Sequence, residues 1–102
     1  MNWFTAQFPE TVDKAVDKLI RDMSFKDKTW LANMDAQKLA AFHASYRVFL
    51  KHELRLWGND PLINSCKAVA GLDAIDADQA AFVILKEIQK KLKGSNVLKV
   101  VK

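Results

Sequence analysis

Four side chains that can carry positive charge recur at four-residue intervals in the middle of the chain. They are His43, Arg47, Lys51 and Arg55. Residues four apart lie on one side of an α-helix, so the spacing predicts a basic ridge, which suits phosphate groups or an acidic protein surface. Like charges at this spacing destabilise a helix slightly, so we expect either an anionic partner or the acids Asp13 and Asp17 of another helix to lie against the ridge.

Glu53 is a carboxylate on the aromatic side of the same segment. A carboxylate among aromatic side chains either finds hydrogen-bond donors or has its pKa raised by desolvation, and both situations recur at functional sites. Leaving it buried and unpaired would cost several kcal/mol. We therefore expect Glu53 to accept hydrogen bonds from the Trp57 indole, the Asn59 amide or backbone N–H groups of residues 58–61.

The other reactive side chains are not spaced for catalysis or metal binding. His43 and His52 are nine residues apart and point to opposite sides of one helix, and Cys66 has no histidine near it and falls on an apolar face. The acids after residue 72 lack the spacing of a calcium-binding loop; they are Asp73, Asp76 and Asp78. We expect no enzymatic activity, no metal and no cofactor.

Length and composition indicate one globular domain. The chain has 102 residues, of which 50% are hydrophobic and 27% charged, and it contains one cysteine. It lacks the roughly 18 consecutive apolar residues of a membrane span, and its first residues have no basic and apolar leader, so we expect a cytoplasmic protein that does not enter a membrane. The net charge of +4 is uneven, because six lysines face only one acid after residue 85.

Apolar residues at three- and four-residue steps predict an all-α bundle of about five helices. The expected helices are 11–23, 25–33, 36–57, 61–70 and 77–93. Helix-capping side chains support these starts, namely Thr11, Ser24, Asp35, and Asp76 paired with Gln79. We expect one domain over residues 1–94, with Trp3, Phe4 and Phe8 folded back on it, and a basic C-terminal tail over 95–102.

Residues 57–61 predict a sharp corner between the third and fourth helices. Gly58 suits the left-handed position that follows a helix, while Asp60 and Pro61 suit the cap and first turn of the next. On a helical wheel, Trp57 continues the aromatic side formed by Tyr46 and Phe49. We therefore expect a buried latch at this corner, formed by Glu53, Trp57, Gly58 and Asp60.

Several short stretches are distinctive in combination: Thr11 to Asp17, Met23-Ser24 with Asp27-Lys28, His43, Trp57-Gly58-Asn59, Cys66, and Asp76 to Asp78. Over about residues 9–93 they resemble a family of small, uncharacterised bacterial all-helical domains, a domain of unknown function whose long helix ends in a Leu-Trp-x-Asn corner. The residues that match that family's pattern are His43, Glu53, Leu56, Trp57 and Asn59. Those that depart from it are Arg47, Lys51, His52 and Arg55. The resemblance implies a helical fold and no particular activity.

The sequence favours a non-catalytic protein-interaction or regulatory domain, because it has three tryptophans near predicted helix ends and tryptophan is enriched at interfaces. Its candidate contact surface consists of Arg47, Lys51, Arg55, Trp57 and Asn59. The expected partner is another protein or a second copy of the chain. One alternative is an anion or nucleic-acid binder that uses the ridge and the C-terminal lysines, although no aromatic residue interleaves the ridge for base stacking. The other is a hydrolase built around Glu53 and His43.

Overall fold

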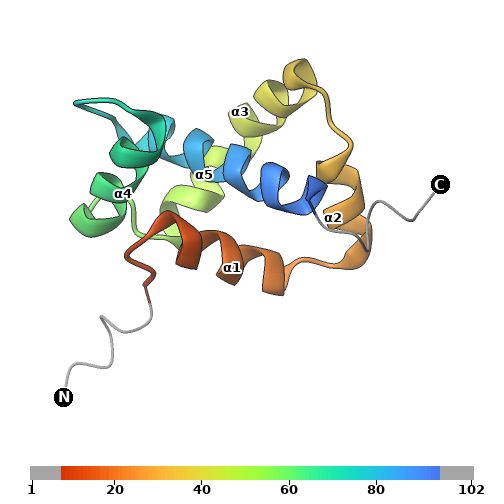
Figure 1. Ribbon diagram of the computed structural model, residues 1–102, viewed down its shortest axis with the longest axis horizontal. Helices are drawn as coiled ribbons and strands as arrows, with labels where there is room; N and C mark the ends of the chain where they lie inside the picture. The colour runs from red at the N-terminus through yellow and green to blue at the C-terminus, as the bar shows by residue number, and fades with distance from the viewer. Residues whose placement is uncertain (1–7, 95–102) are drawn as a thin grey trace.

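The computed structural model describes residues 8–94, which form five α-helices and no strand. The helices are α1 (Val12–Asp22), α2 (Phe25–Ala32), α3 (Ala36–Glu53), α4 (Asp60–Ala70) and α5 (Ala77–Lys93). Figure 1 shows α5 at the centre, where it packs against each of the other four helices. The predicted all-α bundle is confirmed. The expected tail over 95–102 lies outside the described residues, as do Trp3 and Phe4, which were expected to fold back on the domain.

Most helices begin at the side chain predicted to cap them. Thr11, Ser24 and Asp35 each accept a hydrogen bond from the backbone N–H three residues later, at the first turns of α1, α2 and α3. At α5, Asp76 and Gln79 exchange hydrogen bonds in a full capping box. These contacts satisfy N–H groups that a helix leaves without partners, and so set where each helix starts.

The apolar face of α5 supplies much of the core. Ala81, Leu85, Ile88 and Leu92 are all buried, as their spacing predicts. They belong to one core cluster together with buried residues of α1 and of the C-terminal end of α2, both of which contact α5. Gln89 adds a polar tie, since its amide donates hydrogen bonds to the carbonyls at the end of α2 and in the α2–α3 connection. None of the helices in residues 8–94 is long and apolar enough to cross a bilayer.

The long helix α3 ends at Glu53, earlier than the predicted end at residue 57. Arg55 follows in the left-handed conformation, with φ of 56°. The N–H of Leu56 donates to the Lys51 carbonyl at 3.0 Å, and the N–H of Arg55 donates to the His52 carbonyl at 3.3 Å. This is the hydrogen-bond pattern of a Schellman helix end, which glycine usually closes. The left-handed position is therefore Arg55, and the prediction that it is Gly58 was wrong.

The early end of α3 changes which side chains are buried at the corner. Once the helix stops, its wheel no longer predicts direction, and Leu54 and Leu56 enter the core instead of Trp57. Trp57 is 60% exposed, so the prediction of a buried tryptophan was wrong. Phe49, on the same predicted side, is 46% exposed.

Candidate functional site

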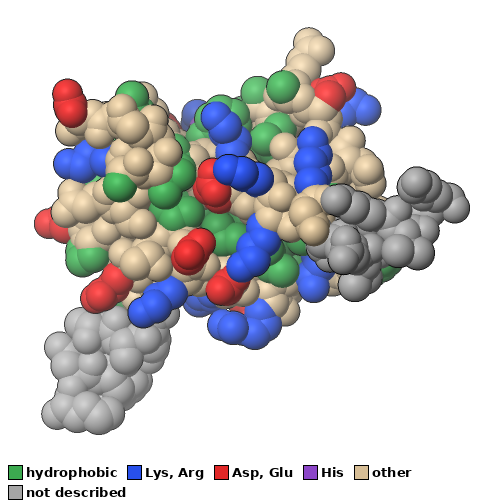
Figure 2. All heavy atoms as spheres, in the orientation of Figure 1, with side chains coloured by type: hydrophobic (Ala, Val, Ile, Leu, Met, Phe, Trp, Pro, Cys, Tyr) green, Lys and Arg blue, Asp and Glu red, His purple; other side chains and the backbone are tan. Residues whose placement is uncertain are grey.

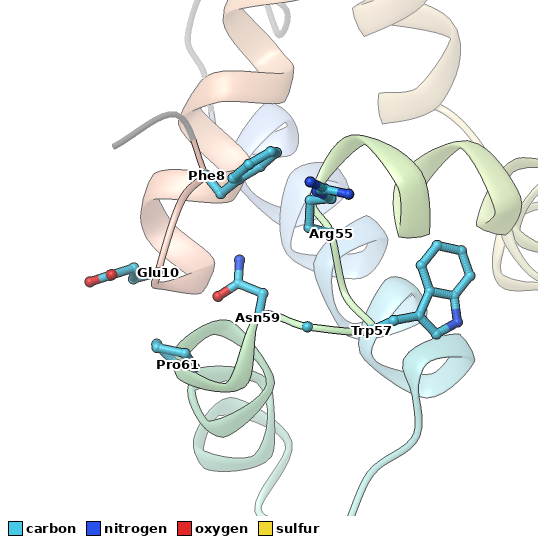
Figure 3. Close-up of a pocket in the computed structure, with 7 residues that line it drawn as sticks. Phe8, Glu10, Arg55, Trp57, Asn59 and Pro61 are labelled. Atoms are coloured by element: carbon cyan, nitrogen blue, oxygen red, sulfur yellow. The ribbon is translucent and has the colours of Figure 1, made fainter. Parts of the chain in front are cut away.

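The corner between α3 and α4 borders an open groove of about 470 Å³. Its lining consists of Phe8, Glu10, Arg55, Trp57, Gly58, Asn59 and Pro61. In Figure 3, Arg55 lies between the rings of Phe8 and Trp57, and Glu10 and Pro61 border the opposite side. The segment before α1 and the start of α4 thus meet the Schellman end of α3, and together they form one surface.

Asn59 holds this corner together from inside. It is 7% exposed, and its amide donates to the carbonyls of Pro9 at 2.8 Å and Leu54 at 3.1 Å. Its side-chain oxygen accepts the N–H of Leu62, so Asn59 is the N-cap of α4, and the prediction that Asp60 caps this helix was wrong. Both amide hydrogens of Asn59 are used within the chain. Asn59 therefore stabilises the backbone under the groove and is not an accessible contact residue.

Trp57 stands at the edge of the groove with two partners from the last turn of α3. The ammonium of Lys51 lies 5.4 Å from the centroid of the indole ring, and the His52 ring packs edge-on at 4.9 Å. These contacts fix the orientation of the indole while leaving most of its surface open to solvent. The tryptophan is presented outward by the corner rather than buried as its latch.

Glu53 takes a different partner from those predicted. Its carboxylate accepts a hydrogen bond from the ammonium of Lys18 on α1 at 3.0 Å, and Lys18 also lies 3.7 Å from Asp22. The expectation of a bond from the Trp57 indole or the Asn59 amide was wrong, because the indole points outward and the amide serves two carbonyls. Glu53 therefore ties α3 to α1.

Arg55 combines an uncommon backbone with an accessible charge. Its left-handed conformation turns the side chain across the start of the corner, where the guanidinium lies 5.1 Å from the centroid of the Phe8 ring. Arg55 is exposed and forms no ion pair with any residue in the described range. A guanidinium held on an aromatic face keeps its N–H groups free to bind a carboxylate.

The basic ridge is interrupted by Asp78, at the start of α5. The carboxylate of Asp78 lies 2.6 Å from the Lys51 ammonium, and His43 Nε2 lies 2.9 Å from the backbone carbonyl of Asp78. The Lys51 contact lowers the pKa of the Asp78 carboxyl. The ridge does meet an acid from another helix, but the expectation that Asp13 and Asp17 supply it was wrong.

The acid expected opposite the ridge is engaged elsewhere. Asp17 pairs with Lys91 near the end of α5, and this contact raises the pKa of Lys91. On the ridge itself, Arg47 and Arg55 stay exposed. The candidate contact surface therefore contains two accessible arginines and the exposed indole of Trp57.

The residues considered for catalysis are held in separate places. His43 packs against Phe82 at 4.8 Å beside the start of α5, whereas Glu53 pairs with Lys18 of α1. Cys66 is fully buried, which raises the pKa of its thiol to about 11 and disfavours the reactive thiolate. His43, Glu53 and Cys66 each take part in contacts between or within helices, and they do not come together at one site.

The predicted contact surface did not include three residues of the groove: Phe8, Glu10 and Pro61. Phe8 was expected only to fold back on the domain, and Pro61 only to begin the fourth helix. Phe8 lies 47 positions before Arg55, and no local pattern joins the two. The sequence holds only a weak indication of this contact. Phe8 lies before the first helix and Arg55 after the third, and neither position falls on the apolar face of a helix. Their pairing required the tertiary structure.

A family model matches residues 8–92, and its description is "Domain of unknown function (DUF6794)". The match spans all five helices up to the last turn of α5 and includes the corner and its groove. It confirms the resemblance to an uncharacterised domain family. Comparison with curated proteins and with solved structures found no match.

Proposed function

Because the chain belongs to this family of domains of unknown function, which carries no assigned activity, we propose from the corner geometry that it is a non-catalytic, cytoplasmic protein-interaction domain. The proposed partner is a peptide segment of another protein in which an acidic side chain neighbours a large apolar one. The apolar side chain packs on Trp57 and the acidic one pairs with Arg55.

The exposed indole of Trp57 is the observation that carries this proposal. A tryptophan offers roughly 150–250 Å² of largely apolar surface, and 60% of this one is open to solvent. At about 25 cal/mol per Å², covering that surface would contribute about 2–4 kcal/mol before the costs of association. Lys51 and His52 already hold the ring, so a partner pays little to order it.

The charges around the groove favour an acidic peptide in one orientation. Arg55 lines the groove and offers positive charge there. Glu10 lines the same groove and offers negative charge. An acidic side chain is therefore favoured beside Arg55 and repelled beside Glu10. Charge complementarity of this kind sets register and orientation as well as affinity.

The backbone at Gly58 leaves room for a bound chain. A Cβ atom added at this position would meet nothing within 4 Å, so open space lies directly against the main chain between Trp57 and Asn59. A partner could approach the backbone there without displacing a side chain. The groove thus combines an aromatic wall, a guanidinium and an accessible backbone.

Selection from a random peptide library tests the proposal. We expect peptides enriched on the wild-type domain to carry Asp or Glu within a few residues of Leu, Phe or Trp. Trp57→Ala should lower their affinity at least about tenfold, which is about 1.4 kcal/mol. Because the indole is exposed, this variant should melt close to the wild type.

Two further variants make the test specific. Val69→Ala removes another exposed apolar side chain, on α4, and should leave peptide affinity unchanged. Arg55→Glu should weaken binding of the acidic peptides and favour basic ones. Enrichment of peptides with no acidic residue, or equal losses in Trp57→Ala and Val69→Ala, would refute the proposed site.

A further inference from the structure

A second pocket, of about 250 Å³, lies away from the corner groove between α1, α2 and α3. Leu85 and Ile88 of α5 form part of its apolar lining, and Trp30, Phe42 and Tyr46 supply its aromatic part. This volume is below the roughly 300–1,000 Å³ typical of sites for drug-sized molecules. It suits a single head group or side chain.

The aromatic residues of this pocket form a continuous cluster. The rings of Trp30 and Phe42 meet edge to face at 5.2 Å, and those of Phe42 and Tyr46 stack at 4.7 Å. Trp30 is nevertheless 57% exposed, although its ring contacts the partly buried Phe42. The cluster is therefore ordered by internal contacts and still offers aromatic surface at the opening of the pocket.

The charge beside these rings is negative. Asp27 is the one charged side chain among the described residues that line the pocket. Partial burial raises the pKa of Tyr46, and the nearby carboxylates of Asp27 and Glu53 raise it further. Lys18 offsets part of the Glu53 charge through their ion pair, whereas Asp27 forms no ion pair with any residue of 8–94.

Three aromatic rings elsewhere in the described residues each have a cation of the same chain over them. Lys51 lies over Trp57, Arg55 over Phe8 and Lys86 over Phe82, each ammonium or guanidinium 5.1–5.4 Å from the ring centroid. No lysine or arginine of the described chain lies over the rings of Trp30, Phe42 or Tyr46. The cluster of Trp30, Phe42 and Tyr46 therefore has a carboxylate beside it and no cation over its rings from residues 8–94.

We propose that this pocket binds a quaternary or alkylated ammonium group, either on a small molecule or on a methylated lysine side chain. Aromatic faces attract such cations, and the alkyl groups gain from apolar walls that would penalise a strongly hydrated ammonium. Asp27 supplies the compensating charge at the opening, and Leu85 and Ile88 contact the alkyl carbons. The corner groove takes an acidic segment, so this site has the opposite preference.

NMR titration of the full chain with choline tests the proposal. Saturable amide shifts should appear in α2 around Trp30 and in α3 around Phe42 and Tyr46. The neutral isostere of choline, in which carbon replaces the quaternary nitrogen, should bind at least about tenfold more weakly, because shape and apolar area are kept and only the charge is lost. Equal binding of the two compounds, or no saturable shift with choline, would overturn the proposal.

Two variants assign the effect to this pocket. Asp27→Asn keeps the size of the side chain and removes its charge, and Trp30→Leu keeps apolar area and removes the aromatic face. Each should weaken choline binding at least about fivefold, while Trp57→Ala should leave it unchanged. Loss of binding in Trp57→Ala with retention in Trp30→Leu would place the ligand at the corner and refute this site.

Two peptides that differ only in trimethylation of one lysine distinguish the sources of the group. Tighter binding of the methylated peptide than of choline itself would identify a modified protein as the ligand. Tighter binding of choline would identify a small molecule. Preference for the unmethylated peptide would contradict the proposed chemistry, since alkylation should strengthen binding.

Discussion

The buried side chain of Asn59 makes three hydrogen bonds. It caps α4, holds the carbonyl of Leu54 at the end of α3, and holds the carbonyl of Pro9 ahead of α1. A buried polar group is costly when a partner is lost, because the partner left behind has no water to replace the bond. The corner therefore depends on this residue more than on the tryptophan beside it.

Replacement of Asn59 by alanine should lower the free energy of unfolding by about 2–4 kcal/mol, since it removes a cap and leaves two carbonyls without their donor. Asn59→Asp keeps the cap acceptor but puts a carboxylate against those carbonyls, and should be at least as damaging at neutral pH. Chemical denaturation measures both. Asp60→Asn, at the next position, should change stability by less than about 0.5 kcal/mol; a larger loss there than at Asn59 would contradict this account of the corner.

Cys66 predicts a fall in stability at alkaline pH. Burial raises its pKa from 9.0 to about 11, so between these values the unfolded chain has lost the thiol proton while the folded chain retains it. Stability must then decrease as pH rises, by up to roughly 1.4 kcal/mol per pKa unit. The measurement is the free energy of unfolding of the wild type minus that of Cys66→Ala from pH 8 to 11, because other titrating groups cancel in the difference. A difference that does not vary with pH would show that the thiol titrates normally.

At the scale of the helix, the way in which α3 ends decides which side chains of the corner are exposed to solvent. The Schellman end at Arg55 turns the chain so that two leucines enter the core and Trp57 points outward. A non-glycine residue in this conformation costs about 1–2 kcal/mol, and strain of this kind is often retained at functional sites. Here it places a guanidinium and an indole in the lining of one groove.

Alanine substitutions at Gly71 and Gly58 test which of these two positions needs a left-handed backbone conformation. Gly71 ends α4 with φ of 70°, so Gly71→Ala should cost about 1 kcal/mol. Gly58 has no positive φ and has open space around it, so Gly58→Ala should be neutral or stabilise by up to about 1 kcal/mol through the unfolded chain. Thermal or denaturant unfolding of both variants checks this. The reverse order would mean that the corner turns at Gly58.

The sequence predicted the helices well because their signals are local. Caps such as Asp35 and Asp76 and the spacing of Leu85 and Ile88 each act within one or two turns. The end of α3 could not be predicted in this way, because Arg55 takes a conformation that its residue type disfavours, and tertiary contacts decide the outcome.

The two candidate sites depend still more on distant contacts than the end of α3 does. One joins Phe8 to Arg55, and the other joins Trp30 to Phe42 and Tyr46 on a different helix. Such pairs follow from packing, and helical periodicity indicates only that an apolar or charged face is present. The sequence therefore indicated that Arg55 and Trp57 lie at this corner, but not that Phe8, Glu10 and Pro61 form a groove with them.

At the scale of the whole molecule, the arrangement of charge decides which kinds of partner are attracted. Figure 2 shows Lys and Arg interspersed with Asp and Glu over the face formed by α1 and α5. On the ridge, Asp78 neutralises Lys51. The net charge of +4 is concentrated after residue 85, and two of those lysines, at positions 99 and 102, lie outside the described part of the chain.

This distribution predicts weak attraction to nucleic acid. A labelled duplex should bind measurably at low salt and lose nearly all of its affinity by 150 mM salt, because few phosphates would be contacted at once. Fluorescence polarisation across a salt series measures this. Binding that persists at physiological salt and is lost in Arg47→Ala would instead favour the anion-binding alternative.

The helix α1 is held in place by residues that are distant in sequence. Asn59 and Ser65 bond to the chain at and just before its start, and Lys91 pairs with its middle; these partners lie about 50 to 74 positions away along the chain. Closing such long loops is slow, whereas α3, α4 and α5 follow one another along the chain. We expect α1 to dock last on a preformed α3–α5 unit and to leave first, so that its amides exchange with solvent ahead of those of α5.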